Sequence, residues 1–318
     1  MSQQVANAVI LIRPTGFGYD PETALTNGFQ RKQVGSDLLR LAAEEFDGLL
    51  EALRSAGIDM VVLDPLDRRA PNGVFPNNWF STHHDGTVVL YPMCTASRRV
   101  ERDPDMARVL SGEGYTTGRT LDFSAWEHKG VILEGTGSLV LDRDFRKAFA
   151  CVSERTTETA LNAWCEALGY APIAFTATSN GYIGAERVYH TNVVMSIGEG
   201  FAVVCFEAMP YPAERQELDD ELRKSGKEVI PITLRQMHAY VGNLLQLRAR
   251  PRAANAMRVA EGGPYIFLSG TAFNALYPEQ RLQLQRHGQL VPVSIPTIES
   301  VGGGSVRCML AENFLERG

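Results

Sequence analysis

The spacing of apolar residues divides the chain into amphipathic helices and short strands. Apolar residues recur at helical spacing over residues 36–56, and Gly57 is expected to end that helix. The same kind of pattern predicts further helices over residues 156–168, 213–224 and 278–286. Short apolar runs predict strands over residues 7–12, 60–63, 244–247, 265–268 and 290–293. The end of the chain, residues 311–316, is typical of a helix.

Three longer segments, each with two strand-like runs around a turn, are typical of β-hairpins: residues 79–91, 131–150 and 187–206. Asp85-Gly86 is the strongest of the turn signals, since this dipeptide suits a tight hairpin turn. A polar residue stands where each hairpin begins, namely Asn78, Glu134 and His190. The step along the chain is 56 residues from Asn78 to Glu134 and 56 again from Glu134 to His190.

This period continues toward the end of the chain. Asn243 opens a fourth strand-like run 53 residues after His190, and Cys308 follows 65 residues later. Five units that contain strands, most of them with a helix, indicate repeated modules around an axis. A closed ring would place the leading polar side chains of all five units at its centre. We therefore expect one catalytic domain over residues 1–318.

Composition narrows the classes of partner. The net charge of -6 offers no basic surface, so nucleic acid is not expected as a partner. Apolar runs stay well short of the roughly 20 residues that span a membrane. Residues 1–8 lack the features of a secretory signal, so we expect a cytoplasmic protein that does not enter membranes.

The cysteines support the same expectation. Their number is five, and no two form a Cys-x-x-Cys pair, so a disulfide framework or a structural zinc site is not expected. Four of them lie in apolar or helical surroundings typical of small buried residues: Cys94, Cys151, Cys165 and Cys205.

Cys308 differs because it follows three consecutive glycines, Gly302 to Gly304. Glycine lets the backbone approach a ligand closely, and nearby backbone N–H groups together with Arg307 could activate the thiol and hold an oxyanion. The alternative is a glycine turn beside a buried cysteine. The period of the leading polar residues favours a nucleophile.

A cysteine nucleophile needs a base, and that base can be distant in sequence. His190 lies in an apolar strand-like run, where a satisfied core histidine is the alternative. His83 and His84 are expected to be solvated beside their turn. Glu134 lies between an apolar run and two glycines, so it is either half of a structural ion pair or a carboxylate that meets a guanidino or ureido group.

The sequence lacks the usual signatures of cofactor chemistry. The glycine run is not followed by the Lys-Ser/Thr of a phosphate-binding loop, and it lacks the setting of a dinucleotide motif. No His, Cys and Asp residues have metal-ligand spacing. We expect chemistry without a cofactor or a metal.

Several segments, in this order along the chain, resemble the guanidino-group-modifying (pentein, arginine deiminase-like) superfamily, and most closely its citrulline-utilization hydrolase branch, which is also described as amidinotransferase. They are Ile12-Arg13-Pro14, Thr26-Asn27-Gly28-Phe29-Gln30, residues 75–83, Glu134-Gly-x-Gly, His190-x-Asn192 and residues 302–312. The resemblance implies an α/β fold in the form of a fivefold pseudo-symmetric propeller. It also implies a catalytic set of Cys308, His190 and Glu134.

The resemblance carries further residues over as substrate contacts. Arg155 matches the arginine that holds the substrate carboxylate, and Arg98 resembles a second such residue, with a solvated helix start as its alternative. Asn27, Asn192 and Asn243 are also expected to contact the substrate. Deiminases usually have aspartate where this chain has Asn78 and Asn192, and superfamily members that cut through to ornithine resemble it in having asparagine at the first of these positions.

Asparagine can donate to and accept from a neutral ureido group. We therefore expect hydrolysis of citrulline to ornithine, carbon dioxide and ammonia. Cys308 would attack the ureido carbon, and His190 would act as acid and then as base. Glu134 would orient the ureido group and stabilise charged His190. Alternatives are an arginine dihydrolase or deiminase, a dimethylarginine hydrolase, an amidinotransferase with an amine acceptor, and a non-catalytic amino-acid-binding propeller. The sequence leaves the oligomeric state open, a homodimer included.

Overall fold

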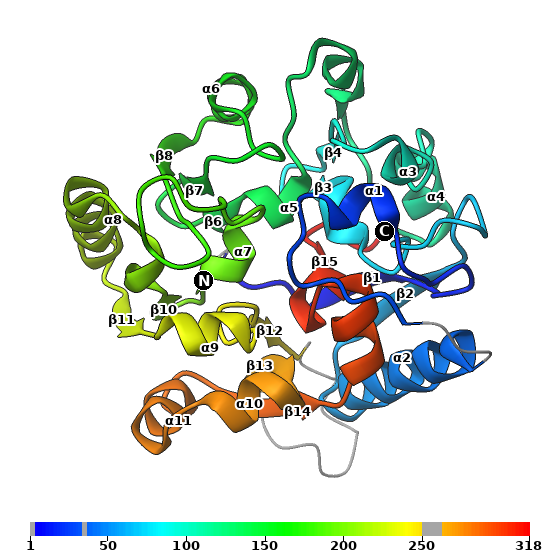
Figure 1. Ribbon diagram of the computed structural model, residues 1–318. Coiled ribbons are helices and arrows are strands. Elements are labelled where there is room, and N and C mark those ends of the chain that lie inside the picture. Colours follow the sequence, from blue (N-terminus) through cyan, green and yellow to red (C-terminus); the bar gives the residue numbers. More distant parts are fainter. Residues whose placement is uncertain (1–3, 34–36, 250–262) are drawn as a thin grey trace.

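The computed structural model describes residues 4–33, 37–249 and 263–318. Within these residues, five three-stranded sheets lie around a common centre (Figure 1). The sheets are β15 (Ala311–Asn313), β1 (Ala8–Ile12) and β2 (Asp59–Leu63); β3 (Phe80–Thr82), β4 (Val88–Leu90) and β5 (Thr120–Asp122); β6 (Val140–Asp142), β7 (Lys147–Cys151) and β8 (Ala171–Phe175); β9 (Met195–Ile197), β10 (Phe201–Val204) and β11 (Glu228–Pro231); and β12 (Leu245–Arg248), β13 (Pro264–Ser269) and β14 (Gln289–Val293).

Each sheet repeats one pairing scheme. The central strand pairs antiparallel with one neighbour and parallel with the other. A parallel pair needs a crossover connection, and helices supply it. These helices are α2 (Leu38–Ser55), α3 (Ala96–Arg99) with α4 (Met106–Gly112), α6 (Glu158–Leu168), α8 (Pro212–Lys224), and α10 (Gly270–Ala275) with α11 (Pro278–Gln285). The longer helices lie on the outside of the ring (Figure 1).

The two ends of the chain close the ring. Strand β15 pairs antiparallel with β1, in the register Ala8 to Asn313, and completes the same sheet as β2. The prediction of a helix over residues 311–316 is wrong, because β1 offers these residues strand hydrogen bonds that local sequence cannot reveal. The expected fivefold α/β propeller is confirmed.

The predicted long helix corresponds to α2, and Gly57 follows it in the left-handed conformation at φ 72°. Residue 36, where the prediction began, lies outside the described residues. Phe46, Leu49 and Leu53 are buried, whereas Leu39 is exposed. The helix therefore packs through one face, as the apolar spacing predicts.

The three predicted hairpins begin later than expected. A short helical turn precedes the first strand of each hairpin: η1 (Pro76–Asn78), which ends on Asn78, and α5 (Gly135–Ser138) and α7 (Thr191–Val194), which follow Glu134 and His190. Glu134 and His190 occupy the N-cap positions of α5 and α7. Gly135 has φ 48°, and a Cβ there would lie 2.2 Å from the carbonyl oxygen of Asn77. This close packing of α5 on η1 brings neighbouring modules together at the centre of the ring.

The remaining elements shape the surface of the ring and its centre. They are α1 (Pro21–Ala24), η2 (Ser124–Lys129), η3 (Phe206–Ala208), α9 (Leu234–His238), the π-helical η4 (Ile298–Gly302) and η5 (Val306–Met309). Asp20 caps α1 by accepting from the backbone N–H groups of Glu22 and Thr23. The other oxygen of Asp20 accepts from Ser97, which fastens α1 to the second module. None of the helices in the described ranges is long and apolar enough to cross a membrane.

Candidate active site

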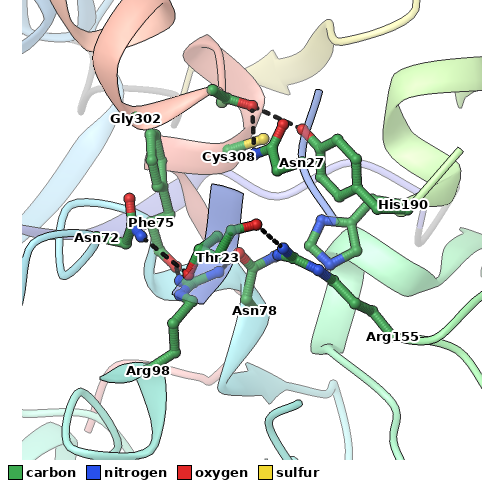
Figure 2. A pocket seen from close by; sticks show the side chains of 13 residues that line it. Thr23, Asn27, Asn72, Phe75, Asn78, Arg98, Arg155, His190, Gly302 and Cys308 are labelled. Atoms are coloured by element: carbon green, nitrogen blue, oxygen red, sulfur yellow. Dashed lines mark hydrogen bonds between the residues drawn. The ribbon is translucent and has the colours of Figure 1, made fainter. Parts of the chain in front are cut away.

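A narrow pocket lies at the centre of the ring (Figure 2). Its walls come from the α1 segment, from η1 and α3, from single residues of the third and fourth modules, and from the glycine run. The lining residues are Thr23, Asn27, Asn72, Phe75, Asn78, Arg98, Arg155, Tyr189, His190, Gly302, Gly303, Gly304 and Cys308. Segments far apart in sequence thus meet here.

The five leading polar residues gather at this centre. Asn78, His190 and Cys308 line the pocket itself. Glu134 lies within hydrogen-bond distance of His190, and Asn243 donates to the sulfur of Cys308. The ring position predicted from the period therefore agrees with the geometry.

His190 and Glu134 form a buried pair, with 2.7 Å between Nε2 and Oε2. A carboxylate only accepts, so Nε2 carries the hydrogen and Nδ1 is left as the basic nitrogen. A Cβ at Gly137 would lie 2.8 Å from Nδ1 and 2.3 Å from Nδ2 of Asn78. Glycine at this position leaves room for both side chains.

The environment fixes the charges of this pair. Burial opposes ionisation of Glu134, but the charge of Arg155 and the hydrogen bond from His190 outweigh it, so the pKa of Glu134 lies well below its usual range. Burial lowers the pKa of His190 to about 4, and the hydrogen bond that His190 donates to Glu134 offsets this only in part. At neutral pH the pair is therefore a carboxylate and a neutral imidazole.

Glu134 is held on both oxygens. Oε1 accepts from the backbone N–H of Cys94 at 2.9 Å, while Oε2 faces His190 and lies 3.6 Å from a guanidinium nitrogen of Arg155. This geometry fits the predicted support of His190 better than the predicted orientation of a ureido group.

Cys308 lies in η5 and is buried. Its sulfur accepts from the side-chain amides of Asn243 at 3.3 Å and Asn192 at 3.6 Å. Arg307, which we expected to assist the thiol, donates instead to the carbonyl oxygen of Thr136 at 2.9 Å. Its guanidinium thus holds α5 and makes no hydrogen bond to the sulfur among the described contacts, and the expected assistance from its charge stays a prediction.

The glycine run is required by the protein's own packing. Gly303 has φ 66°, and a Cβ there would lie 2.6 Å from Nδ2 of Asn27. Its carbonyl oxygen accepts from Asn27 at 3.2 Å and from the hydroxyl of Tyr189 at 2.6 Å. A Cβ at Gly304 would lie 2.9 Å from the ring of Phe75. These contacts position the loop that precedes Cys308.

Arg98 is buried, so the alternative of a solvated helix start is wrong. It forms a bidentate pair with Glu101, and it donates to Oδ1 of Asn78 at 2.7 Å. Because arginine only donates, Asn78 must present its oxygen to Arg98. The nitrogen Nδ2 of Asn78 is then an open donor; it is buried and has no partner among the described residues.

Arg155 connects the pocket to the α1 segment. It donates to the hydroxyl of Thr26 and, at 2.9 Å, to the carbonyl oxygen of Thr23. Its guanidinium also lies 5.0 Å from the ring centre of Tyr189. A role for Arg155 in carboxylate binding stays a prediction.

Some pocket residues have no signal in the sequence pattern. Asn72, Thr23 and Tyr189 lie outside any spacing that we could interpret, because the fold alone brings them to the centre. Glu101 had a signal that was missed, since it stands three residues after Arg98, in the turn that follows α3.

The remaining histidines and cysteines lie elsewhere. His83 is buried and contacts the hydroxyl of Ser81 at 3.0 Å, so the prediction that it is solvated is wrong; His84 is exposed, as predicted. All five cysteines are free thiols. Burial raises the pKa of three of them to about 12, in keeping with a structural role: Cys151, Cys165 and Cys205. Among the described residues, no group of three or more His, Cys, Asp or Glu side chains is placed to hold a metal ion.

Comparison with known proteins adds the family. A family model described as N,N dimethylarginine dimethylhydrolase, eukaryotic, matches residues 13–315. A search among curated proteins found no match.

Similar solved structures share the fold. The N-terminal domain of ArgZ, an arginine dihydrolase of the ornithine-ammonia cycle in cyanobacteria, was solved with bound substrate; it is 13% identical, with a TM-score of 0.71, over 95% of this chain and 96% of that chain. AgrE with L-arginine is 15% identical, with a TM-score of 0.71, over 98% of this chain and 41% of that chain. The dimethylarginine hydrolase DDAH of Pseudomonas aeruginosa, in complex with citrulline, is 16% identical, with a TM-score of 0.64, over 97% of this chain and 100% of that chain.

At these identities the likeness to solved structures establishes the fold, and the family model establishes the family. The chain belongs to the N,N dimethylarginine dimethylhydrolase family of the pentein superfamily, and it is a cysteine-dependent hydrolase of the kind that acts on C–N bonds of guanidino groups.

Proposed function

We propose that this hydrolase cleaves the ureido group of citrulline and releases ornithine, carbon dioxide and ammonia. The observation that supports this proposal most is the orientation of Asn78. Arg98 occupies its oxygen, so the side chain offers the pocket an N–H donor. A guanidinium carries only donors, whereas a ureido group has a carbonyl oxygen that accepts.

The proposed reaction uses Cys308 as the nucleophile. Its thiol proton passes to Nδ1 of His190, and the sulfur attacks the ureido carbon. His190 returns the proton to the departing nitrogen, which leaves an S-carbamoyl (thiocarbamate) group on Cys308. His190 then takes a proton from water as the water attacks this carbonyl carbon; the C–S bond breaks, and the proton returns to the thiolate of Cys308. The carbamate product that leaves breaks down to carbon dioxide and an amine.

Charges around the pair suit this cycle. Nδ1 of His190 is unprotonated at neutral pH, so it can accept the first proton. The carboxylate of Glu134 stabilises the imidazolium that forms, at 2.7 Å from Nε2. We therefore assign Glu134 to support of His190.

The amino-acid end of the substrate would meet the other side of the pocket. Arg155 is the proposed partner of the α-carboxylate. Asn72 donates its Nδ2 to Asp20, so its oxygen, which is buried and has no partner among the described residues, is open to an ammonium group. Asn27 holds Gly303 and thereby shapes this wall.

Arginine dihydrolysis is the second candidate. Two successive hydrolyses of a guanidino group must pass through a ureido group, so a donor from Asn78 would serve the second step of that reaction as well. Deimination and dimethylarginine hydrolysis end at citrulline and are less favoured by this donor. Transfer to an amine would use the same residues with a different acceptor.

Product analysis separates these functions. Purified protein would be incubated separately with citrulline, arginine, dimethylarginine and agmatine, and ammonia and amino acids would be quantified. The proposal expects ornithine and ammonia in equal amounts from citrulline. Citrulline that accumulates from arginine or dimethylarginine, together with inertness toward added citrulline, would contradict it. The single domain over residues 1–318, the cytoplasmic location and the oligomeric state stay predictions.

A further inference from the structure

The sulfur of Cys308 is faced by two side-chain amides that belong to different residues of the ring. Nδ2 of Asn243 lies 3.3 Å from Sγ, and Nδ2 of Asn192 lies 3.6 Å from it. Both distances are within the range of hydrogen bonds to sulfur. Both asparagines are almost fully buried, so bulk water does not compete for the sulfur at these positions.

The surroundings fix which end of the Asn243 amide meets the sulfur. Its oxygen accepts from the backbone N–H of Arg307 at 3.1 Å, and its nitrogen donates to the carbonyl oxygen of Asn192 at 3.1 Å. If the amide were turned over, its N–H group would face the backbone N–H of Arg307, and its oxygen would face the carbonyl oxygen of Asn192. Asn243 therefore presents a donor to Cys308, and it also holds the backbone of the preceding residue.

The Asn192 amide is fixed in a similar way. Its nitrogen lies 3.4 Å from the carbonyl oxygen of Thr136, which can only accept. The same carbonyl accepts from Arg307 at 2.9 Å, so Thr136 stays in place. The donor of Asn192 is thus shared between Thr136 and the sulfur.

Two donors aimed at one sulfur favour its charged form over its neutral form. A thiolate accepts stronger hydrogen bonds than a thiol does, since bonds to an ionised partner are charge-assisted. The nearest arginine in sequence, Arg307, makes no hydrogen bond to the sulfur among the described contacts, because the nitrogen on that side donates to Thr136.

We propose that Asn192 and Asn243 are catalytic residues that stabilise the thiolate of Cys308 through their side-chain N–H groups, instead of contacting the substrate as the sequence led us to expect. The proton of the thiol leaves to Nδ1 of His190 in this step, and no other bond changes. The inference rests on Cys308 as the nucleophile of the proposed function, but it does not depend on which guanidino or ureido compound is the substrate.

Alkylation of Cys308 against pH tests the proposal without any substrate. The rate of its reaction with iodoacetamide would be followed from pH 5 to 10 by peptide mass spectrometry, which separates Cys308 from the other four cysteines. In Asn192→Ala and in Asn243→Ala, the profile is expected to move to higher pH by about one unit, so that alkylation at pH 7 is about tenfold slower. The double variant should move further than either single variant.

Asn243→Asp separates stabilisation of the thiolate from support of the loop. Aspartate keeps an oxygen for the backbone N–H of Arg307 and replaces the donor that faces the sulfur with a charge of the wrong sign. We expect slower alkylation at pH 7 than in Asn243→Ala. Asn313→Ala is the matched control, because this asparagine is also buried but donates to no thiol among the described contacts. Its alkylation profile should coincide with that of the wild type.

The result that would overturn the proposal is an alkylation profile that stays in place in all four variants of Asn192 and Asn243, the double variant included, whether or not turnover falls. The two asparagines would then serve the substrate or the fold. Failure of the proposed function has a different signature: Cys308→Ala would stay active, or citrulline would not react, whatever the alkylation profiles are.

Discussion

Arg98 donates to Oδ1 of Asn78 at 2.7 Å, and this one hydrogen bond decides what the pocket offers a substrate. Glu101 neutralises Arg98 through a contact of 2.7 Å, so the arginine brings little net charge to the site. Asn78 lines the pocket and is left with a buried N–H donor that has no partner among the described residues. The carbonyl oxygen of a neutral ureido group could accept from this donor, whereas a guanidinium of the same shape would bring one of its own N–H donors against it.

Replacement of the nucleophile should abolish turnover and leave the fold intact. In Cys308→Ala, nothing else in the pocket can form the covalent intermediate. Activity would be measured as ammonia release, and the fold by circular dichroism. Cys165→Ala is the matched control, since this buried thiol lies in α6 outside the pocket, and it should keep its activity. Residual activity of Cys308→Ala above a tenth of the wild type would sink the assignment.

His190→Ala should reduce kcat by about 10²- to 10⁴-fold, the usual contribution of a positioned acid or base. The dependence of kcat/KM on pH in the wild type tests the same role of His190. Since the pKa of His190 is lowered to about 4, Nδ1 stays basic down to about pH 5, and kcat/KM should fall only as the pH approaches 4. If kcat/KM of the wild type instead fell with a midpoint near 6.5, the ordinary pKa of histidine, and His190→Ala kept its rate, His190 would be a core residue and not the catalytic base.

The same pair should make the folded state sensitive to acid. The folded pKa of His190 is lower than its unfolded value of 6.5, so the unfolded chain binds an extra proton between about pH 6.5 and 4, and stability falls as pH drops through this window. Glu134 has a lowered folded pKa, so its contribution is present above its unfolded value of 4.5 and is lost below it.

Urea unfolding at pH 7 and pH 5 measures this effect. We expect the free energy of unfolding to drop between the two conditions in the wild type and to drop less in His190→Asn, which cannot titrate. His128→Asn, at an exposed position, should behave like the wild type. Equal drops in all three proteins would contradict the assigned charge states.

Arg155→Ala should raise KM for the amino-acid substrate strongly. The loss of binding free energy is expected to be roughly 2–5 kcal/mol if a buried charge pair is truncated. The variant also removes a cation that lies 3.6 Å from Glu134 and the bonds to Thr23 and Thr26, so kcat can fall too. The decarboxylated analogue of citrulline isolates the carboxylate. It should be a poor substrate of the wild type, and its kcat/KM should fall less than that of citrulline in Arg155→Ala. Equal losses for both compounds would speak against carboxylate capture.

Much of the architecture could be predicted from the chain because it is periodic. The spacing of Asn78, Glu134 and His190 reports the repeat of the modules, and a repeat around an axis brings equivalent positions together. Cys308 was also accessible, since its glycine run is a local signal. Both inferences rest on features that can be read from the order of the residues along the chain.

Other features depend on contacts between distant segments. Strand β15 has a helix-like sequence, and only its pairing with β1 makes it a strand. His83 looks like a solvated turn residue until Ser81 and the ring of Trp164 surround it. The buried position of Arg98 and the open donor of Asn78 likewise follow from tertiary hydrogen bonds, which single-sequence patterns do not encode.

The most direct test of the account is the substrate preference of Asn78→Asp. One aspartate oxygen can take the place of Oδ1 opposite Arg98, and the other would put a carboxylate where the amide donor faced the pocket. Glu101 already neutralises Arg98, so the added charge calls for a cation, which arginine brings and citrulline does not. One charge-assisted hydrogen bond is worth roughly 1.5–3 kcal/mol, or about one to two decades of preference. Asn78→Ala, which removes the donor without adding a charge, is the control.

The measurement is kcat/KM for citrulline and for arginine in the wild type and both variants. We predict that the wild type prefers citrulline, that Asn78→Ala weakens citrulline hydrolysis without favouring arginine by a comparable factor, and that Asn78→Asp shifts the ratio toward arginine by about one to two decades. Two results would contradict the account: a wild type that prefers arginine, or a ratio of the two kcat/KM values that Asn78→Asp does not change. Arginine dihydrolysis would then be the better explanation of the site.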